Sequence, residues 1–159
     1  MSDRIAIRDA EPVDAAEIRR LVHANAVFHG KPELAVVTEE MIRRDGFGPE
    51  HQFSALLGSV GGRIAGIAQY AVRYNSWSGT RDLFVMNLFV DEPMRKTGLG
   101  RALMAAAAKR TLELGCVGLS LGVERTNPAL EFYRRLGMEV TDRSAYCRFK
   151  SEDLPALIG

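Results

Sequence analysis

The stretch "RKTGLGRAL" at residues 95–103 places two glycines one residue apart within a basic segment. It follows "LFVMNLFV" at residues 83–90, which is almost entirely apolar, and it precedes an alanine-rich run that is typical of a helix. A glycine turn between a buried strand and a helix lets the backbone approach a ligand closely. Because the first N–H groups of a helix have no partner within it, this arrangement predicts an anion site.

The glycine spacing excludes two common phosphate loops. A dinucleotide-binding fingerprint needs a third glycine, where this chain has leucine, and a Walker loop needs four residues between its glycines. The remaining pattern is R-x-x-G-x-G, formed by Arg95, Gly98 and Gly100 and flanked by Lys96 and Arg101. Three cations around a helix start suit a pyrophosphate, although the loop by itself is also compatible with an ordinary turn before a helix.

The composition indicates one globular domain over residues 1–159, with 47% apolar and 26% charged residues. A net charge of +1 provides no general attraction to nucleic acid or to a membrane surface. No apolar run is long enough to span a membrane, and no signal core follows Met1, so we expect a cytoplasmic protein. The scattered histidines predict no metal site, and we expect Cys116 and Cys147 to be reduced core residues.

Periodicity predicts an α/β fold with a mixed central sheet flanked by helices. Gly61-Gly62 marks a hairpin, Thr38 is a candidate helix cap, and the apolar strand 83–90 is expected to be covered on both faces. Helices are expected at about residues 14–26, 39–44, 99–114 and 128–136, the last with Asn127 as its cap. Strands are expected at residues 4–8, 53–60, 63–74, 83–90, 118–123, 138–141 and 145–150.

Two motifs in this order resemble the GNAT superfamily of acetyl-CoA-dependent N-acyltransferases. "RKTGLG" after "LFVMNLFV" resembles its acetyl-CoA loop, and "NPALEFYRRLGM" at residues 127–138 resembles its second motif. Within the superfamily, the diamine (spermidine/spermine) and thialysine acetyltransferases look closest, on "VTEEMIRRDGFG" (37–48), "YNSWSGT" (74–80), "NLFVDEPMRKTGLG" (87–100) and "AYCRFK" (145–150). The resemblance spans nearly the whole chain and implies a single-domain GNAT-like fold whose strand splays before the glycine loop.

The resemblance implies acetyl-CoA as cosubstrate. Backbone groups of Leu88, Phe89 and Val90 would bind the pantetheine arm, which requires a splayed neighbour or a bulge in the strand. Asn127 would lie near the pantetheine, and Tyr133 would be the general acid that protonates the departing thiolate of CoA. The residues implied in holding the pyrophosphate are Arg95, Lys96, Thr97, Gly98, Leu99, Gly100 and Arg101.

The chain departs from the family pattern at three places. In the second motif, Thr126 stands where the family asparagine usually is, and Asn127 follows one place later. Lys96 replaces a glycine of the usual loop, and we expect the phosphate site to survive this change. Diamine acetyltransferases have an acidic residue on the strand before the loop, where this chain has Met86 followed by Asn87. The base that deprotonates the amine is therefore open, with Glu33 as the first candidate. The others are Asp82, Glu124 and His29.

The implied reaction is acetyl transfer to a primary amine of a small molecule (a diamine, a polyamine or an amino-acid-like amine) by direct attack in a ternary complex. The segment "VFHGKPELAV" at residues 27–36 keeps Glu33 but carries His29 and Lys31 where more acid would suit a polyamine. This favours a smaller or amino-acid-like amine. The side chains that could bind its carboxylate are Arg73, Arg81 and Lys31.

Two alternatives remain open at this point. The chain could be an acetyl-CoA-binding sensor without catalysis, or it could acetylate protein amino groups. Trp77 either lines the amine pocket or packs at a subunit contact. Members of this branch are usually dimers, and the tail after Tyr146 could supply a sheet edge that pairs between chains, so the resemblance implies a homodimer.

Overall fold

The computed structural model describes residues 4–142 and 145–158. The chain forms two compact units that divide between Gly122 and Val123. In the first unit the strands lie in the order β1-β2-β3-β4-β5, with β1 to β4 antiparallel and β5 parallel to β4. The strands are β1 (Ile5–Asp9), β2 (Ser54–Val60), β3 (Arg63–Asn75), β4 (Thr80–Val90) and β5 (Gly118–Leu121).

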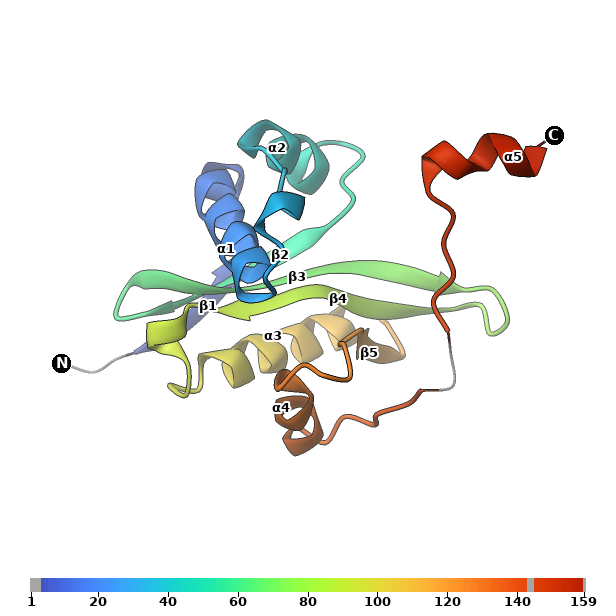
Figure 1. The fold of residues 1–159 in the computed structure, drawn as a ribbon. Helices are drawn as coiled ribbons and strands as arrows, with labels where there is room; N and C mark the ends of the chain where they lie inside the picture. The colour runs from blue at the N-terminus through green and yellow to red at the C-terminus, as the bar shows by residue number, and fades with distance from the viewer. Residues whose placement is uncertain (1–3, 143–144, 159) are drawn as a thin grey trace. The chain divides into compact units, whose positions relative to one another are not determined.

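Helices cover both faces of this sheet (Figure 1). Helices α1 (Ala15–Phe28) and α2 (Glu39–Phe47) lie on one face, and α3 (Leu99–Glu113) lies on the other. The predicted mixed sheet with flanking helices is thus confirmed. In the described part of the chain, none of the helices has the length and apolar character needed to cross a membrane.

Local signals in the sequence account for several boundaries in the first unit. The side chain of Thr38 accepts a hydrogen bond of 3.2 Å from the backbone N–H of Met41, so it caps α2 as expected. Gly61 and Gly62 have φ angles of 58° and 85°, the left-handed values that a tight two-residue hairpin between β2 and β3 requires.

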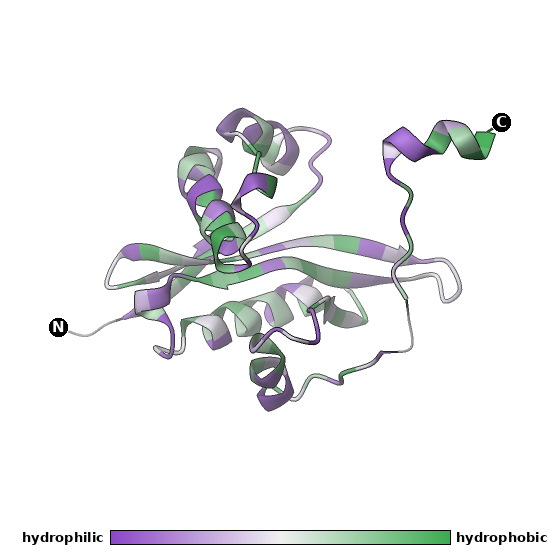
Figure 2. Ribbon diagram, in the orientation of Figure 1, coloured by the Kyte–Doolittle hydropathy of each residue, from purple (hydrophilic) through white to green (hydrophobic). Residues whose placement is uncertain are grey.

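Two apolar layers hold the helices to the sheet. Leu83, Leu99 and Leu103 are fully buried in the layer shared with α3, and Ile18 and Leu21 are fully buried in the layer under α1. Each such side chain contributes about 1.5–3 kcal/mol through burial. Strand β4 has a covered residue on each face, as expected for a strand inside the sheet. Figure 2 shows β4 as mostly hydrophobic and α2 as mostly hydrophilic.

The second unit contains the helices α4 (Ala129–Arg135) and α5 (Leu154–Ile158). The strands predicted at residues 138–141 and 145–150 are wrong, because the described residues there have no regular structure. The described part of this unit holds no strand, so an extended segment there has no neighbour with which to pair its backbone groups. For the same reason Cys147 is exposed rather than buried, whereas Cys116 in the first unit is buried as expected.

Candidate active site

A β-bulge interrupts the pairing of β3 and β4 where the apolar strand approaches the glycine loop. Gln69 pairs with Asn87 and Tyr70 with Val85, so Met86 is the extra residue on β4. An extra residue leaves the ladder locally unpaired and changes which face the following side chains occupy. Met86, the residue at which the resemblance to diamine acetyltransferases implies an acidic side chain, is therefore the point at which β4 changes its course.

The bulge reverses the alternation of side chains along β4. Leu83 and Val85 before it, and Leu88 and Val90 after it, all pack with the layer shared with α3. A regular strand would send these two pairs to opposite faces. The side chains of Asn87 and Phe89 consequently lie on the α1 side, and Phe89 belongs to the apolar layer under α1.

Beyond the bulge, β4 has an open edge within the first unit. Strand β5 pairs only with Asp82 through Val85, so among the described residues of this unit no strand lies beside Met86–Val90 on the edge away from β3. The expected divergence of β4 from its neighbour before the glycine loop is therefore present. Along that edge no described strand of the first unit competes with an extended ligand for the backbone of Leu88–Val90, in which the Val90 carbonyl already accepts from Arg95 Nε.

The loop that follows is shaped by left-handed residues. Gly98 has a φ of 95° and precedes the first residue of α3, and Lys96 has a φ of 64°. Lys96 therefore adopts, without being glycine, the conformation that the glycine of the usual loop would supply, at a cost of about 1–2 kcal/mol. The hydroxyl of Thr97 donates to the Met94 carbonyl at 2.7 Å and fixes the loop at its middle.

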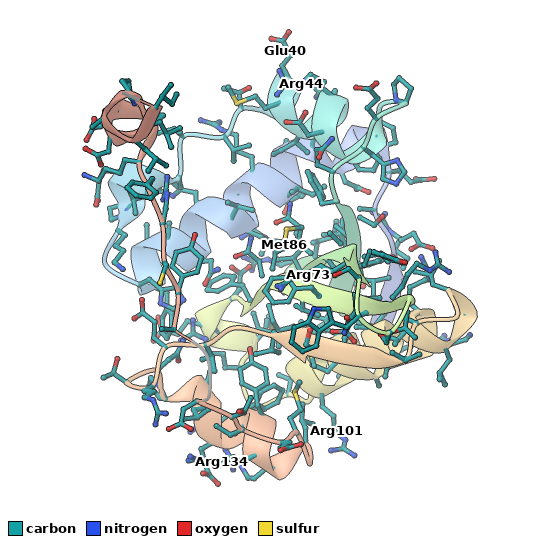
Figure 3. All side chains as sticks on the ribbon, turned by 90° about the vertical axis from the view of Figure 1, so that its right-hand side faces the viewer. Glu40, Arg44, Arg73, Met86, Arg101 and Arg134 are labelled. Carbon is teal, nitrogen blue, oxygen red and sulfur yellow. The ribbon has the colours of Figure 1, made fainter. Side chains whose placement is uncertain are left out.

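The start of α3 provides unused backbone donors. Leu99 N–H reaches the Thr97 hydroxyl only at 3.4 Å, and the first regular helical bond runs from Ala102 N–H to the Gly98 carbonyl. Among the described residues, the N–H groups of Gly100 and Arg101 have no acceptor. No acidic residue occupies this first turn, and Arg101 projects from α3 toward solvent (Figure 3). The site thus suits a phosphate group.

The side chain of Arg95, at the start of the loop, contacts residues of α1 and β4. Its guanidinium lies 4.4 Å from the centre of the Phe28 ring and 5.6 Å from that of Phe89, and its Nε donates to the Val90 carbonyl at 3.1 Å. Arg95 therefore ties the end of α1 to the end of β4. The His29 ring packs edge-on against the Phe28 ring, with 5.3 Å between the two ring centres.

A chain of amides crosses the α1 side of the bulge. Asn25 Nδ2 on α1 donates to Asn87 Oδ1 at 3.1 Å, and Asn87 Nδ2 donates to Gln69 Oε1 on β3 at 2.9 Å. Sequence reasoning named Asn87 but missed both partners. A glutamine within the apolar run "IAGIAQYAV" was the available signal, because a buried amide requires polar partners.

Glu33, Asp82 and Trp77 lie on different elements of the first unit. Glu33 lies in a short 3-10 helix, η2 (Pro32–Leu34), and is exposed. The carboxylate of Asp82 accepts a hydrogen bond of 2.6 Å from the hydroxyl of Ser120 and so joins β4 to β5. Trp77 is 98% exposed at the tip of the β3–β4 hairpin, so the first unit forms no pocket wall around it.

The second unit holds Asn127 and Tyr133. The side chain of Asn127 accepts a hydrogen bond of 2.9 Å from Ala129 N–H, which satisfies a donor at the start of α4, as its expected role as a cap requires. Tyr133 is buried in α4 with its ring edge-on to Phe132. Burial raises the pKa of the Tyr133 hydroxyl, because the charged phenolate loses its hydration. The hydroxyl is therefore a protonated donor at neutral pH.

The described residues do not form a ligand set for a metal ion. Among residues 4–142 and 145–158, no group of histidine, cysteine or acidic side chains gathers as a metal ligand set would.

Known proteins match this chain over most of its length. The family model "Acetyltransferase (GNAT) family" matches residues 18–138. The thialysine N-epsilon-acetyltransferase of Bos taurus is 28% identical over 167 residues, which cover 98% of this chain and 98% of that protein. The L-ornithine N5-acetyltransferase NATA1 of Arabidopsis thaliana is 26% identical over 95 residues, which cover 59% of this chain and 42% of that protein.

A solved structure has a similar fold. The integron cassette protein VCH_CASS6 from the mobile metagenome of V. cholerae superposes with a TM-score of 0.79 at 20% identity, covering 99% of this chain and 98% of that one. At this level of identity the likeness concerns the arrangement of the strands and helices.

Proposed function

This chain belongs to the acetyltransferase (GNAT) family and is an N-acetyltransferase, and we propose that it transfers the acetyl group of acetyl-CoA to a primary amine of a small molecule. The observation that carries this proposal is the open edge of β4 leading directly into the unfilled start of α3. An extended arm ending in a pyrophosphate matches both features in that order.

In the proposed complex, the backbone of Leu88, Phe89 and Val90 pairs with the pantetheine arm as a neighbouring strand would. The loop from Arg95 to Arg101 holds the pyrophosphate, chiefly through the N–H groups of Gly100 and Arg101. Arg95 takes part by positioning, because its guanidinium is engaged with Phe28 and the Val90 carbonyl. Asn127 lies near the pantetheine in this proposal.

The proposed reaction is a single displacement. The amine nitrogen attacks the acetyl carbonyl carbon, the carbon–sulfur bond breaks, and the thiolate of CoA takes the proton of Tyr133. The raised pKa of Tyr133 supports this role, since the hydroxyl keeps its proton until charge develops on sulfur. The proton that the amine loses passes to a base, for which Glu33 remains the first candidate and His29 the second.

The acceptor side of the proposed site is the α1 face of β4. Met86 and Asn87 stand at the bulge, and the segment with His29 and Glu33 follows α1, which lies over that face. The relatives named for thialysine and ornithine support an acceptor with a side-chain amine. Trp77, remote at its hairpin tip, fits a subunit contact better than a pocket wall.

The proposal also covers the domain organisation, the oligomeric state and the cellular location of the protein. We expect residues 1–159 to work as one domain and to form a homodimer in the cytoplasm. The tail supports association, because it exposes large apolar side chains on its irregular segment and on α5. These are Tyr146, Phe149, Leu157 and Ile158. A clean monomer of 17.5 kDa in sedimentation at micromolar concentration would contradict the homodimer.

A thiol-release assay tests the proposed function. The purified chain is mixed with acetyl-CoA and a panel of small amines, and free CoA is followed with a thiol reagent. We expect release that depends on the amine, together with an acetylated product in the mass spectrum. Binding of acetyl-CoA without release from any amine would favour a sensor, and release only with peptides would favour a protein acetyltransferase.

A further inference from the structure

Arg73 presents an unpaired guanidinium on the acceptor side of the sheet. Its central carbon lies 3.1 Å from the centre of the Phe84 ring, so the aromatic face holds the group in place. Arg73 is exposed, and in the described residues it has neither an ion-pair partner nor a hydrogen-bond acceptor. Figure 3 shows Arg73 and Met86 together on the α1 side of the sheet.

Among the described residues, no carboxylate forms an ion pair or a hydrogen bond with the Arg73 guanidinium, although an acidic residue lies opposite it. Asp82 is its cross-strand partner and keeps its negative charge, and its carboxylate accepts a hydrogen bond of 2.6 Å from the Ser120 hydroxyl on β5. Farther along, the bulge carries Met86, and the amide chain centred on Asn87 is neutral. The acceptor face of β3 and β4 therefore presents a ring-held guanidinium beside a single carboxylate, and toward the bulge it lacks the carboxylates that a polyamine site would need.

The spacing from this cation to the bulge is short. The guanidinium lies over Phe84, and Phe84 precedes Met86 by two residues, or roughly 7 Å along the strand. This separation suits a molecule with an anionic group at one end and an amine a few bonds away. A planar guanidinium backed by an aromatic ring is well suited to bind a carboxylate through two hydrogen bonds.

We propose that Arg73 binds the carboxylate of the acceptor, so that the substrate class is an amino acid with a side-chain amine and not a diamine or a polyamine. This inference rests on the proposed function, since it assigns the acceptor of the same site. Arg73 anchors the carboxylate over Phe84 and directs the amine along β4 toward the bulge. A polycation in the same place would face the Arg73 guanidinium, with Asp82 as the one carboxylate opposite it, and would find no carboxylate at Met86 or Asn87.

The test compares matched acceptors on matched variants. The acceptors are L-ornithine and L-lysine, their carboxyamides, and the diamines of the same chain lengths. The variants are Arg73→Gln, Arg73→Lys and the control Arg63→Gln, which removes one exposed positive charge from the other end of β3. The ratio of kcat/KM for the amino acid to kcat/KM for its amide isolates the contact with the carboxylate.

For the unaltered chain we expect the amino acids to be preferred. Arg73→Gln lowers the ratio by about tenfold or more, mainly through KM, because a charge-assisted pair is lost. Arg73→Lys retains part of the preference, and Arg63→Gln leaves the ratio unchanged. An unchanged ratio in Arg73→Gln, or a preference of the unaltered chain for diamines, overturns the assignment while leaving acetyl transfer intact.

A binding measurement separates this proposal from the proposed function. If no amine releases CoA, acetyl transfer to small amines fails, and calorimetry with L-ornithine in the presence of CoA still tests Arg73. The carboxylate site is supported if the Arg73→Gln variant no longer binds L-ornithine while the Arg63→Gln variant still binds it. Equal binding to Arg73→Gln and the unaltered chain, or binding to neither, overturns it.

Discussion

Replacing Gly66 with alanine places a methyl group between the sheet and the start of α3. The new Cβ would lie 3.0 Å from Leu103 Cδ1, 3.1 Å from Leu99 Cδ2 and 3.2 Å from the Phe89 carbonyl oxygen. Ordinary contacts between carbon atoms are about 3.5–4.0 Å, so α3 must move away from the sheet by roughly half an ångström. The first turn of α3 is the proposed pyrophosphate site, and the same displacement therefore shifts its free N–H groups.

The expected cost follows from overpacking, which is about 1–3 kcal/mol. Gly122→Ala is the matched control, because its Cβ meets nothing within 4 Å. Both substitutions lower the entropy of the unfolded chain alike, so the difference between them isolates the crowding. At about 2–4 °C per kcal/mol for a chain of this size, Gly66→Ala should melt about 2–12 °C below Gly122→Ala.

The assay is thermal unfolding of both variants, followed by titration with acetyl-CoA below their melting temperatures. We expect Gly66→Ala to bind acetyl-CoA more weakly than Gly122→Ala as well as melting earlier. Equal melting temperatures and equal affinities in the two variants would refute the reasoning, because the close approach of α3 would then be unnecessary.

Three further predictions concern single residues. Tyr133→Phe should lower kcat about 100-fold or more while leaving acetyl-CoA affinity unchanged in calorimetry, and undiminished turnover would exclude its role as the acid. Lys96→Gly should relieve the left-handed backbone and leave the protein as stable or up to about 1 kcal/mol more stable in urea unfolding, whereas Gly98→Ala should destabilise it. The Arg8 guanidinium lowers the pKa of Asp14 through two hydrogen bonds of 2.7 Å, so that pair contributes stability above about pH 4 and loses it as the pH falls further. Asp14→Asn should therefore melt earlier than the unaltered chain at pH 7, with the gap closing below about pH 4, and a gap independent of pH would contradict this coupling.

The first unit could be predicted from the sequence because its signals are local. Thr38, the Gly61-Gly62 pair and the glycines of the loop each fix a backbone feature through their own chemistry, and the structure has those features where they were expected. The apolar run 83–90 likewise indicated a covered strand. The expected pantetheine pairing requires a splayed neighbour or a bulge. The position of the bulge at Met86 depends on the pairing with Gln69, which the sequence of β4 alone does not encode.

The remaining features depend on partners that are distant in the sequence. The amide chain joins Asn25, Gln69 and Asn87 from three elements, and the side chain of Arg95 turns to Phe28 on α1. Alternation in the tail suggested a strand and a buried Cys147, but alternation predicts a strand only where a neighbour pairs with it. The local pattern of residues was therefore enough to locate the proposed cofactor loop, whereas the proposed acceptor face could be recognised only from the fold.

The central claim is that acetyl-CoA lies along the open edge of β4 with its pyrophosphate at the start of α3. Titrating ¹⁵N-labelled protein with CoA and following the backbone amide resonances tests this most directly. The largest shifts should fall on Lys96–Arg101, with a second group on Leu88–Val90, and Gly66→Ala should weaken the binding seen at both. Saturable binding of CoA that leaves the amides of both segments unshifted would contradict the account.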